Sequence, residues 1–202
     1  MKTKTRILGI LAVVGLFAIF AFKPLDDKKV IVIDAGHGGH DFGAVKYGIE
    51  EKTIVENISK KVKALNKDAN VEIVLLRDGD HFMELSERVS IINNLKPNLV
   101  VSLHVNANMS SEKNGIEAYV SSKNEKFKEV STVSAEKLLS TISNKSLAKG
   151  KVKEAPFYIM KNSDCPAVLL ELGYLSNDAD RDYLTSEEGQ NEIATKILES
   201  VK

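Results

Sequence analysis

Cysteine, tryptophan and proline are scarce in this sequence, which has one cysteine, no tryptophan and four prolines in 202 residues. The single cysteine, Cys165, excludes an intrachain disulfide and thiolate-rich zinc sites. It precedes Pro166 and an apolar run, and no histidine stands near it, so we interpret it as a small buried hydrophobe rather than a nucleophile. An excess of positive charge is also lacking, since 28 basic side chains balance 28 acidic ones. We therefore expect no nucleic-acid partner.

The first 24 residues differ in character from the rest of the chain. Basic side chains before residue 7 precede an uncharged run from Ile7 to Phe22, which is typical of a secretory signal. The run is short for a membrane-spanning helix and no cleavage site is clear, so residues 1–24 are either a signal peptide or an uncleaved signal anchor. We expect export to the periplasm or cell envelope, either secreted or anchored to the inner membrane through residues 7–22. Residues 25–29 form a short linker to one domain, residues 30–202.

Short apolar runs alternate with helical patterns along this domain. The runs predict strands at residues 30–33, 71–76, 98–104, 115–120, 157–160 and 167–170. The longest of them are apolar without interruption, which is typical of strands buried on both faces of a parallel sheet. We therefore expect a single α/β domain with a mostly parallel, mixed central sheet of about six strands, flanked by helices.

Four segments carry a helical spacing of apolar residues. They lie at about residues 52–67, at residues 83–92 with Ser86 as a candidate cap, inside residues 121–153, and after the capping-box pattern Thr185–Glu188. The segment from Ser121 to Lys153 is polar and rich in lysine. We interpret it as a peripheral amphipathic helix flanked by solvated loops, although it is also the one segment long enough to form a lid.

Chemically active side chains follow three of the predicted strands. His37 lies in a glycine-rich loop after the first strand, His104 ends the third, and Glu171 ends the last. Because parallel strands end at the same edge of a sheet, we expect these side chains to converge, and Glu51 at the start of a helix can point to the same edge. Two imidazoles and a carboxylate are a known catalytic zinc set, while a second carboxylate moves the proton. A phosphate-binding loop is the weaker alternative, because the lysine-serine pair and the G-x-G-x-x-G spacing are absent.

A series of motifs, in a fixed order, resembles the zinc-dependent N-acetylmuramoyl-L-alanine amidases, the cell-wall hydrolases often called amidase 3. The resemblance covers roughly residues 30–202. It rests on Asp34-Ala-Gly-His-Gly-Gly39, Gly48-Ile-Glu-Glu-Lys52, Arg77-Asp78, Glu87-Arg-Val89, Ser102-Leu-His-Val-Asn-Ala107, Gly115-Ile-Glu-Ala-Tyr119 and Pro166-Ala-Val-Leu-Leu-Glu-Leu-Gly-Tyr-Leu-Ser-Asn177.

The resemblance implies that His37, Glu51 and His104 bind one zinc ion and that Glu171 is the catalytic carboxylate. Glu50 is the neighbouring alternative to Glu51, which we prefer because Lys52 follows it directly, as in the family. The implied reaction is hydrolysis of the peptidoglycan amide between the lactyl group of N-acetylmuramic acid and L-alanine of the stem peptide.

Other residues of these motifs are expected to support the ligands or to contact substrate, namely Asp34, Arg77 and Asn106. Asn106 departs from the family's common aspartate, and Ala35 from its common proline. The span from His104 to Gly115 is too short for the inhibitory helix that some relatives carry until an activator protein binds, and an unidentified activator protein stays open as a partner. Two other functions stay open: a zinc peptidase that cuts a different amide of the same polymer, and a non-catalytic wall-binding protein.

Overall fold

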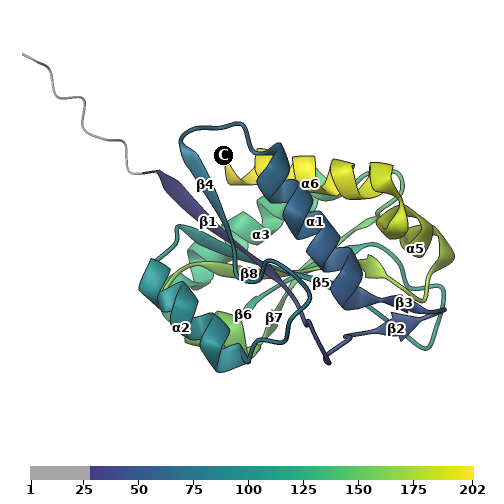
Figure 1. Ribbon diagram of the computed structural model, residues 1–202, viewed down its shortest axis with the longest axis horizontal. Coiled ribbons are helices and arrows are strands. Elements are labelled where there is room, and N and C mark those ends of the chain that lie inside the picture. The colour runs from purple at the N-terminus through teal and green to yellow at the C-terminus, as the bar shows by residue number, and fades with distance from the viewer. Residues whose placement is uncertain (1–27) are drawn as a thin grey trace, which may run out of the picture.

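The computed structural model describes residues 28–202, so the predicted signal segment lies outside the described residues. A six-stranded sheet crosses the molecule (Figure 1), in the order β4-β1-β5-β8-β6-β7. Neighbouring strands are parallel except for β6, which is antiparallel to β8 and parallel to β7. The strands are β1 (Lys29–Ala35), β4 (Val71–Leu75), β5 (Leu99–Asn106), β6 (Ile116–Ser121), β7 (Lys149–Ala155) and β8 (Ala167–Tyr174).

Helices cover both faces of this sheet. One face carries α1 (Glu51–Leu65), α3 (Lys128–Ile142) and α6 (Glu187–Val201), and the other carries α2 (Leu85–Leu95) and α4 (Tyr158–Asn162) (Figure 1). A further helix, α5 (Asp178–Thr185), packs on α6 and β8. The predicted α/β domain with a mostly parallel, mixed sheet is therefore confirmed.

The two central strands show why the sheet forms here. In β1 the consecutive residues Ile31 to Ile33 are fully buried, and in β5 Val100 and Val101 are equally buried. Their side chains alternate between the core under α1, α3 and α6 and the smaller core under α2 and α4. Burial on both faces removes the polar alternation that an exposed strand would show.

Residues 157–160 are not a strand as predicted, because α4 begins at Tyr158. A run of four apolar residues is compatible with either structure, and here Ile159 and Met160 are buried side by side in the smaller core while Phe157 is exposed. The helix ends at Asn162, and the Ser163 hydroxyl donates to the carbonyl of Ile159 at 2.7 Å.

The segment from Ser121 to Lys153 contains a strand as well as the predicted helix. Helix α3 buries Leu138, Leu139 and Ile142 in the larger core, so it is a peripheral helix of the fold rather than a lid. The end of the segment forms the edge strand β7, where the sequence predicted a solvated loop. Alternating lysines obscured it, as is common in edge strands that resist pairing with other chains.

A short hairpin and a short helix were also not predicted, and two helix caps were misplaced. The hairpin of β2 (Val45–Lys46) and β3 (Ile49–Glu50) leads directly into α1, and α5 is capped by Asn177. Helix α2 begins after Glu84, so Ser86 does not cap it. The predicted capping box from Thr185 is also wrong by one residue, because Thr185 ends α5 and Ser186 caps α6 by accepting from the Gly189 amide at 3.0 Å. Across residues 28–202, no helix is both long enough and apolar enough to span a bilayer.

Candidate metal centre and active-site cavity

His37 lies on the glycine-rich loop after β1, where its backbone φ is 61°. This left-handed conformation is uncommon for a residue other than glycine, so the surroundings must hold it in place. The Nδ1 atom lies 2.9 Å from Oδ2 of Asp41, and the other Asp41 oxygen accepts from the Gly43 amide at 3.1 Å. A carboxylate on one ring nitrogen fixes the imidazole and directs the other nitrogen toward a metal.

Glu51 brings a carboxylate to the same point from the first residue of α1. Its Oε1 lies 3.1 Å from Nε2 of His37 and 2.9 Å from Nδ1 of His104. The same oxygen accepts from the Val105 amide at 3.0 Å, and Oε2 accepts from the Ala44 amide at 2.8 Å. Ligand atoms of His37, Glu51 and His104 all lie within 4.8 Å of one another, so these three side chains can hold one metal ion.

His104 stands near the end of β5 and packs tightly against Gly36. Its ring lies edge-on to that of His37, with 4.9 Å between the centroids. A Cβ atom added to Gly36 would lie 2.5 Å from Cε1 and 2.7 Å from Nε2 of His104. Glycine is therefore required here for the imidazole to keep its place.

A Gly36→Ala substitution is accordingly expected to displace the His104 ring and weaken metal binding. Overpacking of this kind costs about 1–3 kcal/mol, which corresponds to roughly 5-fold to 150-fold in affinity. Chelator competition measures the affinity. In the control Gly48→Ala the added carbon meets nothing within 4 Å. The left-handed φ of 76° makes alanine cost about 1–2 kcal/mol of stability there, but zinc affinity should stay unchanged. Unchanged affinity in Gly36→Ala would contradict this packing argument.

Glu171 lies opposite His104 in the parallel register of β5 and β8. Its Oε2 is buried without a hydrogen-bond partner among the described residues. Burial raises the pKa of Glu171 to about 7; the imidazole of His104 opposes this rise, and the carboxylates of Glu51 and Glu117 add to it. A carboxyl group that titrates near neutrality is well suited both to take and to return a proton.

Two buried arginines hold the loop that carries His37. Arg77 donates to the carbonyls of Ala35 at 3.0 Å and Gly36 at 3.1 Å. Arg88 donates to the carbonyls of Ala35 at 2.8 Å and His37 at 2.5 Å. Together they bind consecutive carbonyls up to the histidine, which explains how its left-handed backbone is maintained.

Asp34 balances the charge of Arg88 beneath this loop. The Asp34 carboxylate is fully buried, lies 2.5 Å from Nη1 of Arg88, and accepts from the Ser102 hydroxyl at 2.6 Å. Removing one partner of such a pair would leave an uncompensated buried charge. Asp34 and Ser102 therefore stabilise the floor beneath the metal centre.

The structure brings His37, Glu51, His104 and Glu171 together as predicted. Glu50, the alternative to Glu51, instead lies before α1 with Oε2 3.7 Å from Nζ of Lys52. Among the expected supporting residues, Asp34 and Arg77 hold the histidine loop as described above.

Asn106, the third expected supporting residue, lies at the end of β5, where its amide oxygen accepts from the Ala107 amide at 2.8 Å. The contributions of Asp41, Arg88 and Ser102 were not predicted from the sequence. Arg88 and Ser102 stand inside motifs that carried the resemblance, but their hydrogen bonds connect segments far apart in sequence. Cys165 is buried, and burial raises the pKa of its thiol to about 12, so it is unsuited to act as a nucleophile.

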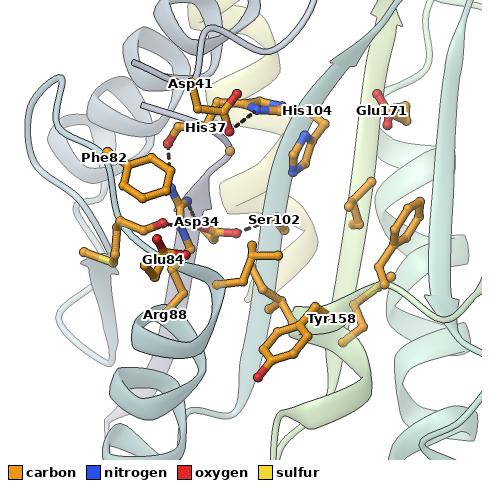
Figure 2. A pocket seen from close by; sticks show the side chains of 17 residues that line it. Asp34, His37, Asp41, Phe82, Glu84, Arg88, Ser102, His104, Tyr158 and Glu171 are labelled. Atoms are coloured by element: carbon orange, nitrogen blue, oxygen red, sulfur yellow. Dashed lines mark hydrogen bonds and ion pairs between the residues drawn. The ribbon is translucent and has the colours of Figure 1, made fainter. Parts of the chain in front are cut away.

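A cavity of about 530 Å³ opens beside His37, His104 and Glu171. Figure 2 shows these three residues toward one end, with Phe82 and Arg88 on one side and Tyr158 farther along. The cavity continues between α2 and α4 along Phe82, Met83, Glu84, Leu85, Arg88, Phe157, Tyr158, Ile159, Met160 and Leu169. The metal-ligand group thus lies at one end of a pocket large enough for part of a small-molecule substrate.

An α/β sheet that carries a His-Glu-His group next to a partly buried carboxylate defines a metal-dependent hydrolase. The chain belongs to the N-acetylmuramoyl-L-alanine amidase family Amidase_3, whose model matches residues 31–202.

The chain is also similar to individual proteins. The chain is 37% identical over 183 residues to "Uncharacterized protein YqiI" of Bacillus subtilis strain 168, covering 90% of this chain and 86% of that protein. An N-acetylmuramoyl-L-alanine amidase from Clostridium difficile 630 superposes with a TM-score of 0.80 at 28% identity, covering 87% of this chain and 95% of that one. The CwlD amidase of Clostridioides difficile, solved in complex with the GerS lipoprotein, superposes with a TM-score of 0.75 at 30% identity, covering 86% and 96%.

Proposed function

We propose that this protein is an N-acetylmuramoyl-L-alanine amidase that uses one zinc ion. It hydrolyses the amide between the lactyl group of N-acetylmuramic acid and the L-alanine of the peptidoglycan stem peptide. The observation that carries the proposal is the placement of Glu171, with its unpartnered buried oxygen, beside a compact His37, Glu51 and His104 group. Family membership supports the choice of bond.

The donor set supports zinc as the ion. Two imidazole nitrogens and one carboxylate oxygen are a common catalytic zinc set, which leaves a coordination position for water or substrate. Asp41 on the far nitrogen of His37 is the supporting contact that such histidines usually have. Bound zinc would supply Lewis acidity, polarising the scissile carbonyl and making a water molecule a stronger nucleophile near neutral pH.

Glu171 is proposed to move the proton during hydrolysis. Its carboxylate takes a proton from the attacking water and then delivers it to the amide nitrogen, so that L-alanine leaves with a neutral amine. Because its pKa lies near 7, neither transfer is strongly uphill. Meanwhile Arg77 and Arg88 hold the loop backbone, so that His37 does not have to reorganise during the reaction.

Zinc affinity is expected to increase as pH rises toward 9. Burial lowers the pKa of His37, but hydrogen bonds and charges from Glu51 and Asp41 outweigh it and raise the pKa to about 9 in the metal-free protein. Because only the neutral imidazole binds a metal, zinc must displace a proton below that pH, and affinity should rise about tenfold per pH unit. Competition with a chelator of known pH dependence measures this slope. An affinity independent of pH between 6 and 8 would contradict it.

The site of action and the partners are part of the same proposal. A peptidoglycan substrate requires export, for which the basic start and the uncharged run from Ile7 to Phe22 are the supporting sequence features. Residues 7–22 are proposed to anchor the enzyme to the membrane if they are retained. The complex of the related CwlD with a lipoprotein supports a partner protein for this chain too.

The amino termini released from purified peptidoglycan test the proposed function. Labelling of new amino groups after digestion with the zinc-loaded protein should identify L-alanine as the exposed residue. Any other amino-terminal residue would show a peptidase that cuts within the stem. Treatment with a chelator should abolish the release and added zinc should restore it.

A further inference from the structure

The half of the cavity away from the metal ligands is lined by apolar side chains that the proposed chemistry does not use. Its rim carries four large residues that remain 37–49% exposed, two on the α2 side and two on the α4 side: Phe82, Leu85, Phe157 and Tyr158. Its floor is buried and apolar, formed by Met160 and Leu169 among others. Exposed apolar side chains gathered around a cavity are typical of a ligand-binding surface.

The aromatic rings of this rim are held in place by neighbours. Phe82 packs against the imidazole of His40 with 4.1 Å between ring centroids. Phe157 meets the ring of Tyr119 edge-on at 5.4 Å. Rings fixed in this way offer flat apolar faces at little entropic cost, which suits the C–H face of a sugar ring and its N-acetyl methyl group.

The charges around the cavity exclude an anionic occupant. Arg88 is the one lysine or arginine that lines it within residues 28–202, and Asp34 and backbone carbonyls occupy its guanidinium. Of the carboxylates that line the cavity, Asp34 is paired with Arg88, and Asp41 and Glu171 lie at the end that carries the metal ligands. This leaves Glu84 as the carboxylate of the half-cavity, and no cation among residues 28–202 forms an ion pair with it. A stem peptide carries carboxylates of its own and would be repelled here. The muramoyl sugar is neutral, because its carboxyl group is consumed in the amide.

A cation for the peptide lies on the other side of Glu171. Glu117 of β6 is opposite Glu171 in the sheet, and Lys153 of β7 reaches it with 2.6 Å between Nζ and Oε1. The Lys153 side chain is 44% exposed and lies over the Tyr119 ring. The two sides of the scissile bond therefore differ. One side is apolar with Glu84 among its lining residues, and the other presents an exposed ion pair of Lys153 and Glu117.

We propose that the half-cavity between α2 and α4 binds the muramoyl sugar, while the stem peptide leaves the site over β6 and β7. This inference rests on the proposed function and gives the substrate its direction across the metal centre. It makes Phe82 and Tyr158 specificity residues for the sugar.

A pair of substrates that share one stem peptide tests this direction. One carries N-acetylmuramic acid, and the other carries only a D-lactoyl group at the same amide. Tyr158→Ala and Phe82→Ala should each lower kcat/KM for the muramoyl substrate about tenfold, through KM, and for the lactoyl substrate less than about twofold. Met109→Ala, a fully exposed residue outside the cavity, should leave both unchanged. Equal losses on the two substrates would overturn the inference.

Binding without turnover separates this inference from the proposed function. Saturation-transfer NMR with the zinc-loaded protein and the neutral methyl amide of N-acetylmuramic acid should show transfer to the N-acetyl methyl protons. The transfer should be lost in Tyr158→Ala and reduced in Tyr158→Leu, which keeps apolar bulk if the alanine variant fails to fold. Transfer without cleavage of either substrate would support the sugar site and refute the amidase. Cleavage without transfer would overturn the sugar site alone.

Discussion

A Glu171→Gln protein is expected to bind zinc like the unsubstituted protein but to hydrolyse its substrate about a thousandfold more slowly, since a general acid–base group contributes roughly 10²–10⁴-fold. Glutamine has nearly the same shape as glutamate, but its amide cannot accept the water's proton. Glu171 lies outside the group of His37, Glu51 and His104 that can hold the metal, so the ligand set stays intact. The buried, unpartnered Oε2 of Glu171 is the atom whose chemistry the substitution removes.

The measurement pairs kcat on a muramoyl peptide with the zinc content of the same preparation. Glu84→Gln is the matched control, because it removes a carboxylate from the α2 side of the same cavity and should keep nearly full kcat. A zinc-loaded Glu171→Gln protein with more than about a tenth of the normal rate would refute the role given to Glu171.

Glu51→Gln is expected to lower zinc affinity at least about a hundredfold and to abolish activity when zinc is limiting. The effect should exceed the 10-fold to 100-fold of residues that only support a ligand. Oε1 of Glu51 faces the nitrogens of both histidines, and a neutral amide there removes the one anionic ligand. Loss of the carboxylate also lowers the pKa of His37, which reduces competition from protons and offsets a part of the loss, but the missing ligand has the larger effect.

Glu50→Gln provides the comparison for this second variant, since Glu50 is adjacent in sequence and lies outside the ligand group. Its zinc affinity should equal that of the unsubstituted protein when both are measured by chelator competition at one pH. Zinc affinity lost in Glu50→Gln and kept in Glu51→Gln would reverse the ligand assignment.

Burial on both faces made the centre of the fold predictable from sequence. The apolar runs of β1, β5 and β8 have no polar alternation, so their positions and their parallel direction could be predicted from the pattern of apolar residues. The edge strand β7 and the short helix α4 were harder to predict. Lysines alternate with Val152 in β7 and conceal the strand, and the four residues after Ala155-Pro156 fit a strand as well as a helix until packing chooses between them.

The side chains expected to bind metal were recognisable because histidine is rare in this sequence and because both candidate histidines lie at or just after the ends of predicted strands. The residues that hold these side chains in place could not be recognised in the same way. Arg88 binds Asp34 and the carbonyl of His37 across more than fifty positions of sequence, a contact that only the folded chain creates. Likewise the need for glycine at Gly36 arises from the His104 ring packed against it, which sequence spacing does not express.

The most direct test of the proposed amidase activity is to hydrolyse a synthetic N-acetylmuramoyl stem peptide in ¹⁸O-labelled water and to find which product carries the label. Mass spectrometry of both products should show one heavy oxygen in the lactyl carboxyl group of N-acetylmuramic acid. The released peptide should begin at L-alanine and carry none. Label inside the stem peptide, with the lactyl amide intact, would show that the metal centre cuts a different bond and would contradict the account.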